Sequence, residues 1–481
     1  MEQTTARQEN SAAIPSLPPG PNGYPVIGVL PQFISSTWLD FMTRWAREYG
    51  DMVHMNLIGK PLCYINRPEY IKAVLVTNAE SFHKSRGYSV VLRRMLGDGL
   101  VTSEDETWLR ARRIYQPAFK KDQINAFAAL ASKYATQMGD QWKDGAVRDI
   151  QHDMMTVTLQ VAADVFGLDL GNDIDEIGGA LNAAMAEFSS VSNYLLPEWL
   201  PTPSMHRFKK AIASFDAVVE RIIERKRANP GDGTDLLAML MKACDDKVLT
   251  ERQFRDEIKT TLVSGHETTA NTLSWTWHLL SQYPEVLQKL RDEVYAVCGD
   301  RLPALEDLPK MPYLRKVFKE SMRVYPTAYT IGRSAIRDVS IGPYMFPAGM
   351  TVIMAPWVVH HNAKYYPDPE RFDPERWTDE FNKSLPEYAY FPFGGGPRGC
   401  IAEPFAIAEA GIIIATLVRK FNITPKAGST VTPCPAITLR PKDGVWVNVH
   451  AVQASANGKH DAADVAVGAS ECPYRSASVA A

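Results

Sequence analysis

The sequence feature that most constrains the fold is one long helix predicted over residues 250–283. Thr250 and Gln253 form a capping-box pattern at its start, and Pro284 marks its end. At about 1.5 Å per residue such a helix is roughly 50 Å long, enough to cross a whole domain. A chain organised around it must pack most of its other segments alongside as helices.

The remaining segments predict a mainly α fold with a minor segregated β region, an α+β class. Helices are expected at 38–49, 68–76, 108–119, 285–297 and 313–325, and over most of 122–226. Strands are expected in a hairpin at 52–65, in a β-rich stretch at 330–352, and in a closing hairpin at 436–449 around Asp443 and Gly444. Residues 18–452 are interpreted as a single domain between a flexible lead, 1–17, and a disordered tail, 453–481.

Composition argues against several classes of protein. A formal net charge of −3 over 481 residues does not fit a nucleic-acid binder. The polar N-terminus lacks the apolar region of a signal peptide, and no window reaches the roughly 18 to 20 apolar residues of a membrane span. The six cysteines lack the paired spacing of a disulfide framework or a zinc site. We therefore expect a soluble, cytoplasmic monomer without a membrane anchor.

Residues 393–400, Phe-Gly-Gly-Gly-Pro-Arg-Gly-Cys, directly precede an apolar helix. A cysteine at the start of a helix meets the first-turn N–H groups, which lower its pKa and favour the thiolate. Glycine lets the backbone approach a flat ligand closely. The pattern suits a thiolate bound axially to haem iron. The alternative is a glycine-rich turn around a buried, inert cysteine.

A second pattern, Ser264-Gly265-His266-Glu267-Thr268-Thr269, lies in the middle of the long helix. A Thr hydroxyl that bonds the preceding turn can bend the helix and open a groove beside a ligand. An acid and an alcohol facing that groove can deliver protons during O₂ activation. The alternative is a polar stripe that faces solvent.

Two weaker patterns involve charged pairs on helix faces. Glu320 and Arg323 are spaced i, i+3, and Trp108 and Arg112 are spaced i, i+4. An arginine and an indole N–H on one face can hold a carboxylate, such as a haem propionate. Each pattern is equally typical of a solvated amphipathic helix.

In their order along residues 18–450, these patterns resemble the cytochrome P-450 (haem-thiolate monooxygenase) family, soluble bacterial type. The resemblance implies haem b held between the long helix and the cysteine-loop helix, with O₂ as co-substrate. It implies that Cys400 is the axial thiolate, shielded by Phe393. The implied propionate ligands are Trp108, Arg112 and Arg398, and the implied proton-delivery pair is Thr268 with Glu267.

The resemblance also implies structural and substrate-binding residues. Glu320 and Arg323 form a structural pair locked by an arginine of a Pro-Glu-Arg segment, which occurs twice; the aromatic flanks favour Arg376 over Arg371. The implied substrate pocket contains Val101, Val263, Ser264, Ala328 and Tyr329, with mobile walls near 97–100 and 185–205. Ala402 stands where the family usually has glycine, and Ser264 where it usually has alanine.

Electrons are expected from a ferredoxin or flavodoxin with its reductase, and ultimately from NAD(P)H. Arg110, Arg113, Lys120 and Lys121 offer a basic face for such an acidic partner, although a merely solvated basic helix has the same composition. The expected reaction is hydroxylation or epoxidation of a hydrophobic small molecule such as a fatty acid, terpenoid, steroid or drug-like compound. Two alternatives are a peroxide-using or isomerising haem-thiolate enzyme and a non-catalytic haem sensor or carrier.

Overall fold

The computed structural model describes residues 17–34, 37–85, 92–171, 176–179, 183 and 199–452, and most of them are helical. Most of the predicted lead and all of the predicted tail lie outside these residues. The α-helices that this article uses are α2 Trp38–Tyr49, α3 Pro68–Lys72, α5 Asp105–Tyr115, α6 Lys121–Gly139, α7 Ile150–Phe166, α10 Pro203–Ala228, α11 Leu236–Asp245, α12 Glu251–Gln282, α13 Pro284–Cys298, α14 Pro312–Val324 and α17 Glu403–Val418. Short helical segments are α1 Leu30–Ile34, α15 Pro356–His360, α16 Asp379–Ser384, the π-helix η1 Ala73–Thr77, and the 3₁₀ turns η2 Ala79–Ser81, η3 Gln116–Phe119, η4 Leu305–Lys310, η5 Pro374–Arg376 and η6 Gly396–Arg398.

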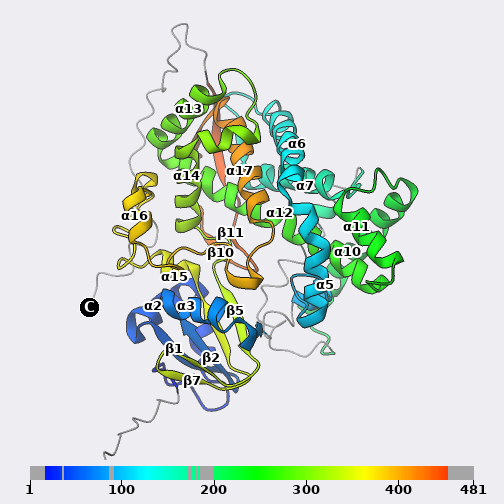
Figure 1. Ribbon diagram of the computed structural model, residues 1–481. Helices are drawn as coiled ribbons and strands as arrows, with labels where there is room; N and C mark the ends of the chain where they lie inside the picture. The colour runs from blue at the N-terminus through cyan, green and yellow to red at the C-terminus, as the bar shows by residue number, and fades with distance from the viewer. Residues whose placement is uncertain are drawn as a thin grey trace, which may run out of the picture.

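Helix α12 is the predicted long helix, and it runs through the centre of the molecule with α17 beside it (Figure 1). The Thr250 side chain accepts from the Gln253 N–H while the Gln253 side chain accepts from the Thr250 N–H, so the predicted capping box is present. The helix ends before Pro284, which opens α13. Helix α7 packs along α12 more extensively than any other helix does.

Most of the β structure lies at one end of the molecule, together with α2 and α3 and below most of the helices in Figure 1, whereas β10 and β11 lie among the helices. Its largest sheet has the order β1-β2-β8-β5-β3, formed by Met52–Leu57, Lys60–Ile65, Thr351–Met354, Ile331–Ala335 and Phe82–Lys84. β1 and β2 form the predicted hairpin, with Met52 opposite Ile65. β3 pairs antiparallel with β5, so Lys84 lies opposite Arg333. A two-stranded sheet of β6 Val339–Ile341 and β7 Tyr344–Phe346 completes the predicted β-rich stretch.

The predicted closing hairpin around Asp443 and Gly444 is wrong. β11 Leu439–Pro441 pairs with β10 Pro433–Pro435, whereas β12 Trp446–Ala451 pairs with β9 Phe421–Pro425 and β4 Val147–Asp149. Asp443 and Gly444 do form a turn, with Gly444 at a φ of 85°, but the turn carries the chain from one sheet to another. The turn residues were interpreted correctly, and the distant partner strands decided the pairing.

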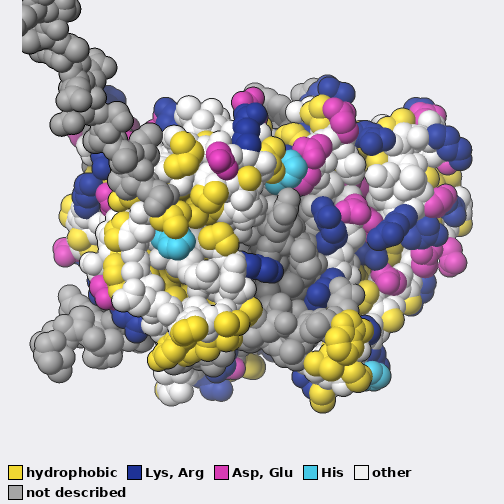
Figure 2. All heavy atoms as spheres, turned by 90° about the horizontal axis from the view of Figure 1, so that it is seen from below, with side chains coloured by type: hydrophobic (Ala, Val, Ile, Leu, Met, Phe, Trp, Pro, Cys, Tyr) yellow, Lys and Arg dark blue, Asp and Glu magenta, His cyan; other side chains and the backbone are white. Residues whose placement is uncertain are grey.

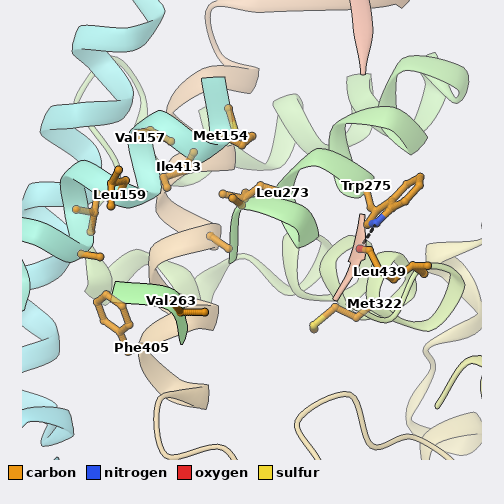
Figure 3. Close-up of a cluster of buried hydrophobic side chains, with 14 of the residues drawn as sticks. Met154, Val157, Leu159, Val263, Leu273, Trp275, Met322, Phe405, Ile413 and Leu439 are labelled. Carbon is orange, nitrogen blue, oxygen red and sulfur yellow. Dashed lines mark hydrogen bonds between the residues drawn. The ribbon is translucent and has the colours of Figure 1, made fainter. Parts of the chain in front are cut away.

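The helical part has an apolar core to which α7, α12, α14 and α17 contribute side chains (Figure 3). Trp275 is fully buried there, and its Nε1 donates a 2.9 Å hydrogen bond to the Leu439 carbonyl oxygen. A second, smaller core lies in the β region. No helix in the described part of the chain combines the length and apolar character that a membrane span requires.

Candidate functional site

The glycine-rich loop before α17 is shaped by contacts with the β region. Gly394 and Gly396 have φ values of 75° and 66°, which favour glycine. A Cβ on Gly396 would lie 1.9 Å from the Leu75 carbonyl oxygen, which belongs to η1. The Cys400 N–H donates a 3.0 Å hydrogen bond to the Phe393 carbonyl oxygen, which closes the loop. These glycines are therefore required by the protein's own packing, whatever ligand the loop approaches.

Cys400 is a free cysteine three residues before α17. Burial raises the pKa of its thiol, and this effect outweighs the opposing N–H groups of Ala402 and Glu403 and the Arg112 guanidinium. The N–H groups at the helix start do lower this pKa, as the sequence predicted, but burial raises it by more. The residue nevertheless exposes surface, so a ligand can reach its thiol. A metal cation bound there would make the thiolate the stable form.

Helix α12 also exposes two side chains in an otherwise buried stretch. Between residues 260 and 281 every residue is buried except Ser264, Gly265 and Thr268. Ser264 and Thr268, one turn apart, donate hydrogen bonds to the carbonyl oxygens of Thr260 (2.6 Å) and Ser264 (3.3 Å). Gly265 is explained by packing against α7. A Cβ at this position would lie 2.8 Å from the Phe166 ring. The exposed face of Ser264 and Thr268 leaves room for a ligand beside α12.

Glu267 is buried next to this exposed face. Its Oε1 accepts a 2.8 Å hydrogen bond from the hydroxyl of Thr438, in the turn between β10 and β11. Burial raises the pKa of Glu267 to about 7, and the Thr438 hydroxyl and Arg440 partly oppose that rise. The side chain is therefore able to hold and release a proton near neutral pH.

Arg398, Trp108 and Arg112 come together as the sequence predicted, but they contact different groups. The Arg398 guanidinium lies 4.4 Å from the Trp108 ring centre and forms an ion pair with Glu104. Arg112 Nη1 donates a 2.9 Å hydrogen bond to the carbonyl oxygen of Gly399, directly before Cys400. Arg112 thus contacts the cysteine loop itself.

Two further cations lie close to Arg398 and were missed in the sequence. Arg333 on β5 is buried, and its pKa is lowered to about 10 by burial and by Arg398. Lys84 on β3 donates to the carbonyl oxygens of Leu100 and Ser103, each at 2.8 Å, and burial lowers its pKa to about 7. No sequence pattern marks either residue. Only the pairing of β3 with β5 brings them together, and that pairing was not predicted.

We call Lys84, Glu104, Arg333 and Arg398 the loop cluster. It holds three basic side chains and one carboxylate, so positive charge exceeds negative charge within the cluster. A haem group carries two propionates, and cations without enough anions are favourable partners for them. The loop cluster, the exposed thiol of Cys400 and the exposed face of α12 together fit a haem.

Glu320, Arg323, Arg376 and Trp377 form what we call the structural cluster. Arg323 Nε and Arg376 Nε lie 2.9 and 2.8 Å from the Glu320 carboxylate, and Trp377 Nε1 donates to it at 2.9 Å. Arg323 also donates to the carbonyl oxygens of His360, Pro369 and Arg371. Arg371 offers only its carbonyl oxygen here. The structural cluster is buried and its polar atoms are hydrogen-bonded within the protein.

The predicted pocket residues differ in their surroundings. Val101 and Ala328 are half-buried, whereas Val263 is buried and packs in the helical core. The Tyr329 hydroxyl donates a 2.7 Å hydrogen bond to the Ala436 carbonyl oxygen, in the β10–β11 turn. Tyr329 thus fixes this turn.

Of the two predicted mobile walls, residues 97–100 are tied to α12. The N–H groups of Asp98 and Leu100 donate 2.9 Å hydrogen bonds to the carboxylates of Asp256 and Glu257. Most of the second wall, 185–205, lies outside the described residues. Beside Gly97, a polar pocket of about 310 Å³ is lined by charged side chains of α10 and α12. Figure 2 shows charged side chains of both signs gathered toward the side where α10 lies.

Arg110, Arg113 and Lys120 are exposed, as a basic docking face requires, while the Lys121 side chain lies outside the description. A separate, mainly apolar groove of about 1330 Å³ is lined by parts of α6, η4, α14 and α17 and by Phe393 of the cysteine loop. Its lining contains three basic residues, Lys133, Arg315 and Lys319, and two acidic ones, Glu306 and Glu403. We call this the proximal groove. It reaches the residue predicted to shield Cys400.

Comparison with known proteins identifies relatives along almost the whole chain. The cytochrome P450 family model matches residues 18–447. Cyclooctat-9-en-7-ol 5-monooxygenase of Streptomyces melanosporofaciens is 33% identical over 392 residues, which cover 80% of this chain and 84% of that protein. Pentalenene oxygenase of Streptomyces avermitilis is 28% identical over 431 residues, which cover 87% and 94%. The crystal structure of the cytochrome P450DA heme domain superposes with a TM-score of 0.80 at 25% identity, covering 91% of this chain and 98% of that one.

Proposed function

The chain belongs to the cytochrome P450 family and is a monooxygenase of hydrophobic small molecules, and we propose that its substrate is a terpenoid. The observation that carries this proposal is the naming of two similar proteins for the oxidation of cyclooctat-9-en-7-ol and of pentalenene. The predicted pocket residues support it, because none of them is charged. An apolar ring system needs shape and apolar surface more than ionic contacts.

The family uses haem, and we propose haem b with Cys400 Sγ as its axial ligand. Bound haem supplies the iron at which O₂ is activated. Arg398, Arg333 and Lys84 hold the propionates. The Trp108 ring packs against the Arg398 guanidinium and fixes its position. Arg112 fixes the loop through the Gly399 carbonyl oxygen and places a positive charge near the sulfur. Phe393 covers the loop on the side of the proximal groove.

We assign proton delivery to Thr268 and Glu267. The Thr268 side chain lies on the exposed face of α12. Its hydroxyl can contact a ligand there as well as its own helix. Glu267, with a pKa of about 7, holds a proton at neutral pH and releases it without a large free-energy cost. The alternative, a peroxide-using enzyme, has no need of this pair.

Electrons come from redox partners, and we propose an acidic ferredoxin or flavodoxin that docks at the proximal groove and draws on NAD(P)H. The groove offers apolar surface for contact and basic side chains for attraction of an acidic protein. Its position beside Phe393 gives a short path to Cys400.

The test uses purified holoenzyme and a panel of terpenoids, fatty acids and steroids. A terpenoid substrate should shift the Soret band to the blue and be hydroxylated or epoxidised when NAD(P)H and a ferredoxin system are added. A shift with fatty acids alone would contradict the substrate class. If the reduced carbon-monoxide complex absorbs at the histidine-ligated position, the assignment of Cys400 is wrong.

A matched pair of variants separates the enzyme classes. Thr268→Ala should divert NAD(P)H electrons from product to hydrogen peroxide, because proton delivery is impaired. Thr276 lies on the same helix but is buried, outside the exposed face of α12. Thr276→Ala should therefore leave the yield of product per NAD(P)H unchanged. Full product yield in Thr268→Ala with added peroxide and none with NAD(P)H in the wild type would favour the peroxide-using enzyme.

A further inference from the structure

The hydrogen bond between Glu267 and Thr438 ends a series of four hydrogen-bonded polar side chains. The proposed mechanism uses Glu267 but not the other three. Gln151 Nε2 donates to Asn271 Oδ1 (3.5 Å), Asn271 Nδ2 donates to Thr438 Oγ1 (3.1 Å), and Thr438 donates to Glu267 Oε1 (2.8 Å). The members come from the start of α7, the middle of α12 and the β10–β11 turn. Asn271, Thr438 and Glu267 are all buried.

Every hydrogen bond in this series points toward Glu267. Because Asn271 donates to Thr438, the single proton of the Thr438 hydroxyl is left for Glu267. Oε1 of Glu267 is therefore held as an acceptor, and the proton of the neutral acid resides on Oε2. Oε2 has no hydrogen bond with any residue that the structure describes. Side-chain amides do not pass protons on. This series of hydrogen bonds therefore orients Glu267 and does not supply it with protons.

Among the described residues, no other charged group near Glu267 forms a hydrogen bond with its carboxyl. Arg440 on β11 acts on Glu267 from a distance, without a hydrogen bond among the described residues. On α7, Asp153 is paired with Arg148 at 2.6 Å. On α17, both carboxylate oxygens of the buried Glu409 lack a hydrogen bond with the described residues, and burial raises its pKa. On α12 itself, His266 is bonded to the Leu262 carbonyl oxygen.

We propose that Thr438 is a positioning residue, which fixes the carboxyl of Glu267 and selects Oε2 as the oxygen that exchanges its proton. Asn271 and Gln151 fix the direction of the Thr438 hydroxyl. The β10–β11 turn that carries Thr438 is itself held by Tyr329, through the Ala436 carbonyl oxygen. Proton exchange at Glu267 is thereby tied to the position of this turn.

The test follows the Glu267 carboxyl directly in full-length holoenzyme. Infrared difference spectra across pH record the C=O stretch of the neutral acid, which Glu267→Gln identifies by its loss. Thr438→Val removes the donor without changing the side-chain shape, so the titration midpoint should rise by about one pH unit, a tenfold gain in proton affinity. Thr438→Ser keeps the donor and should restore the midpoint.

Two further variants keep the outcome decisive. Thr276→Val removes a buried hydroxyl of the same helix, which bonds the Thr272 carbonyl oxygen and Ser321, and should leave the midpoint unchanged. Asn271→Leu frees the Thr438 hydroxyl to rotate and should raise the midpoint by less than Thr438→Val does. If Thr438→Val fails to bind haem, Asn271→Leu decides. An unchanged midpoint in the folded variants, or an equal shift in Thr276→Val, would overturn the proposal.

A second readout rests on the proposed monooxygenase function. With farnesol as the terpenoid probe, the pH profile of product formed per NAD(P)H should move up by about one unit in Thr438→Val and stay unchanged in Thr438→Ser. An unmoved profile, with the infrared midpoint shifted, would overturn the link between Thr438 and delivery. Absence of any product in the wild type would count against the proposed substrate class, while the infrared titration would still decide the role of Thr438.

Discussion

The structural cluster and the loop cluster are both groups of charged side chains that are at least half-buried, but they differ in the balance of their charges. In the structural cluster, the Glu320 carboxylate is met by Arg323, Arg376 and Trp377, and the remaining arginine N–H groups reach backbone carbonyl oxygens. In the loop cluster, Glu104 faces three cations, and the pKa values of Lys84 and Arg333 are lowered by burial.

The difference separates charges that hold the fold from charges that await a ligand. Burial of a charge is costly unless the protein supplies partners for it. The structural cluster supplies them internally, so its removal should damage folding. The loop cluster has one carboxylate for three basic side chains, so it should bind an anionic ligand at little cost to the fold.

The largest expected effect is the loss of the structural cluster's carboxylate. Glu320→Gln leaves Arg323 and Arg376 buried without their anion and should lower the free energy of unfolding by about 3–5 kcal/mol. Denaturant unfolding of the purified protein measures this change. A variant as stable as the wild type would show that the structural cluster is not what holds this part of the fold.

In the loop cluster we expect substitutions to weaken haem binding strongly and to change the free energy of unfolding little. Arg398→Leu and Arg333→Leu should each weaken haem retention by roughly tenfold to a hundredfold, the value of a charge-assisted hydrogen bond. The free energy of unfolding of the haem-free protein should fall by less than 1 kcal/mol, because like-charge repulsion is relieved. Transfer of haem to a globin acceptor measures retention. Wild-type retention in both variants would contradict the propionate assignment.

The pH dependence of stability sharpens the comparison further. The folded-state pKa of Lys84, about 7, lies below its ordinary value of 10.5, so between these pH values the folded protein binds fewer protons than the unfolded chain. Stability of the haem-free protein should therefore rise with pH over this interval, by at most about 5 kcal/mol. Lys84→Met should flatten the rise, and bound haem should reduce it. An unchanged slope in Lys84→Met would assign the rise to another group.

The smallest expected effect comes from an exposed pair next to the structural cluster. Glu375, the neighbour of Arg376, pairs with Lys289 and Lys316 at the surface. Glu375→Gln should change the free energy of unfolding by less than about 1 kcal/mol. It is the matched control for Glu320→Gln, and an equal loss in both variants would show that burial does not set the cost.

Features that depend on neighbouring residues, such as helix ends and helix faces, could be predicted from the sequence. The capping box and Pro284 placed both ends of α12, and the positions of Ser264 and Thr268 on that helix follow from its period. Long-range pairing was not readable. Arg333 and Lys84 come together only through the β3–β5 pairing, and Thr438 meets Glu267 only because the β10–β11 turn lies over α12. The failed closing hairpin has the same cause, since a turn does not specify which strands flank it.

The contact between Gly396 and Leu75 has a consequence for how the protein is assembled. The cysteine loop takes its shape against a helix near the start of the chain, and neighbouring Lys72 and Glu387, which pair at 2.6 Å, are 315 residues apart. Contacts between such distant segments form late, after the entropy of closing a very long loop has been overcome. The loop that carries Cys400 therefore reaches its final shape only when nearly the whole chain has been synthesised, because segments from opposite ends of the chain meet beside it.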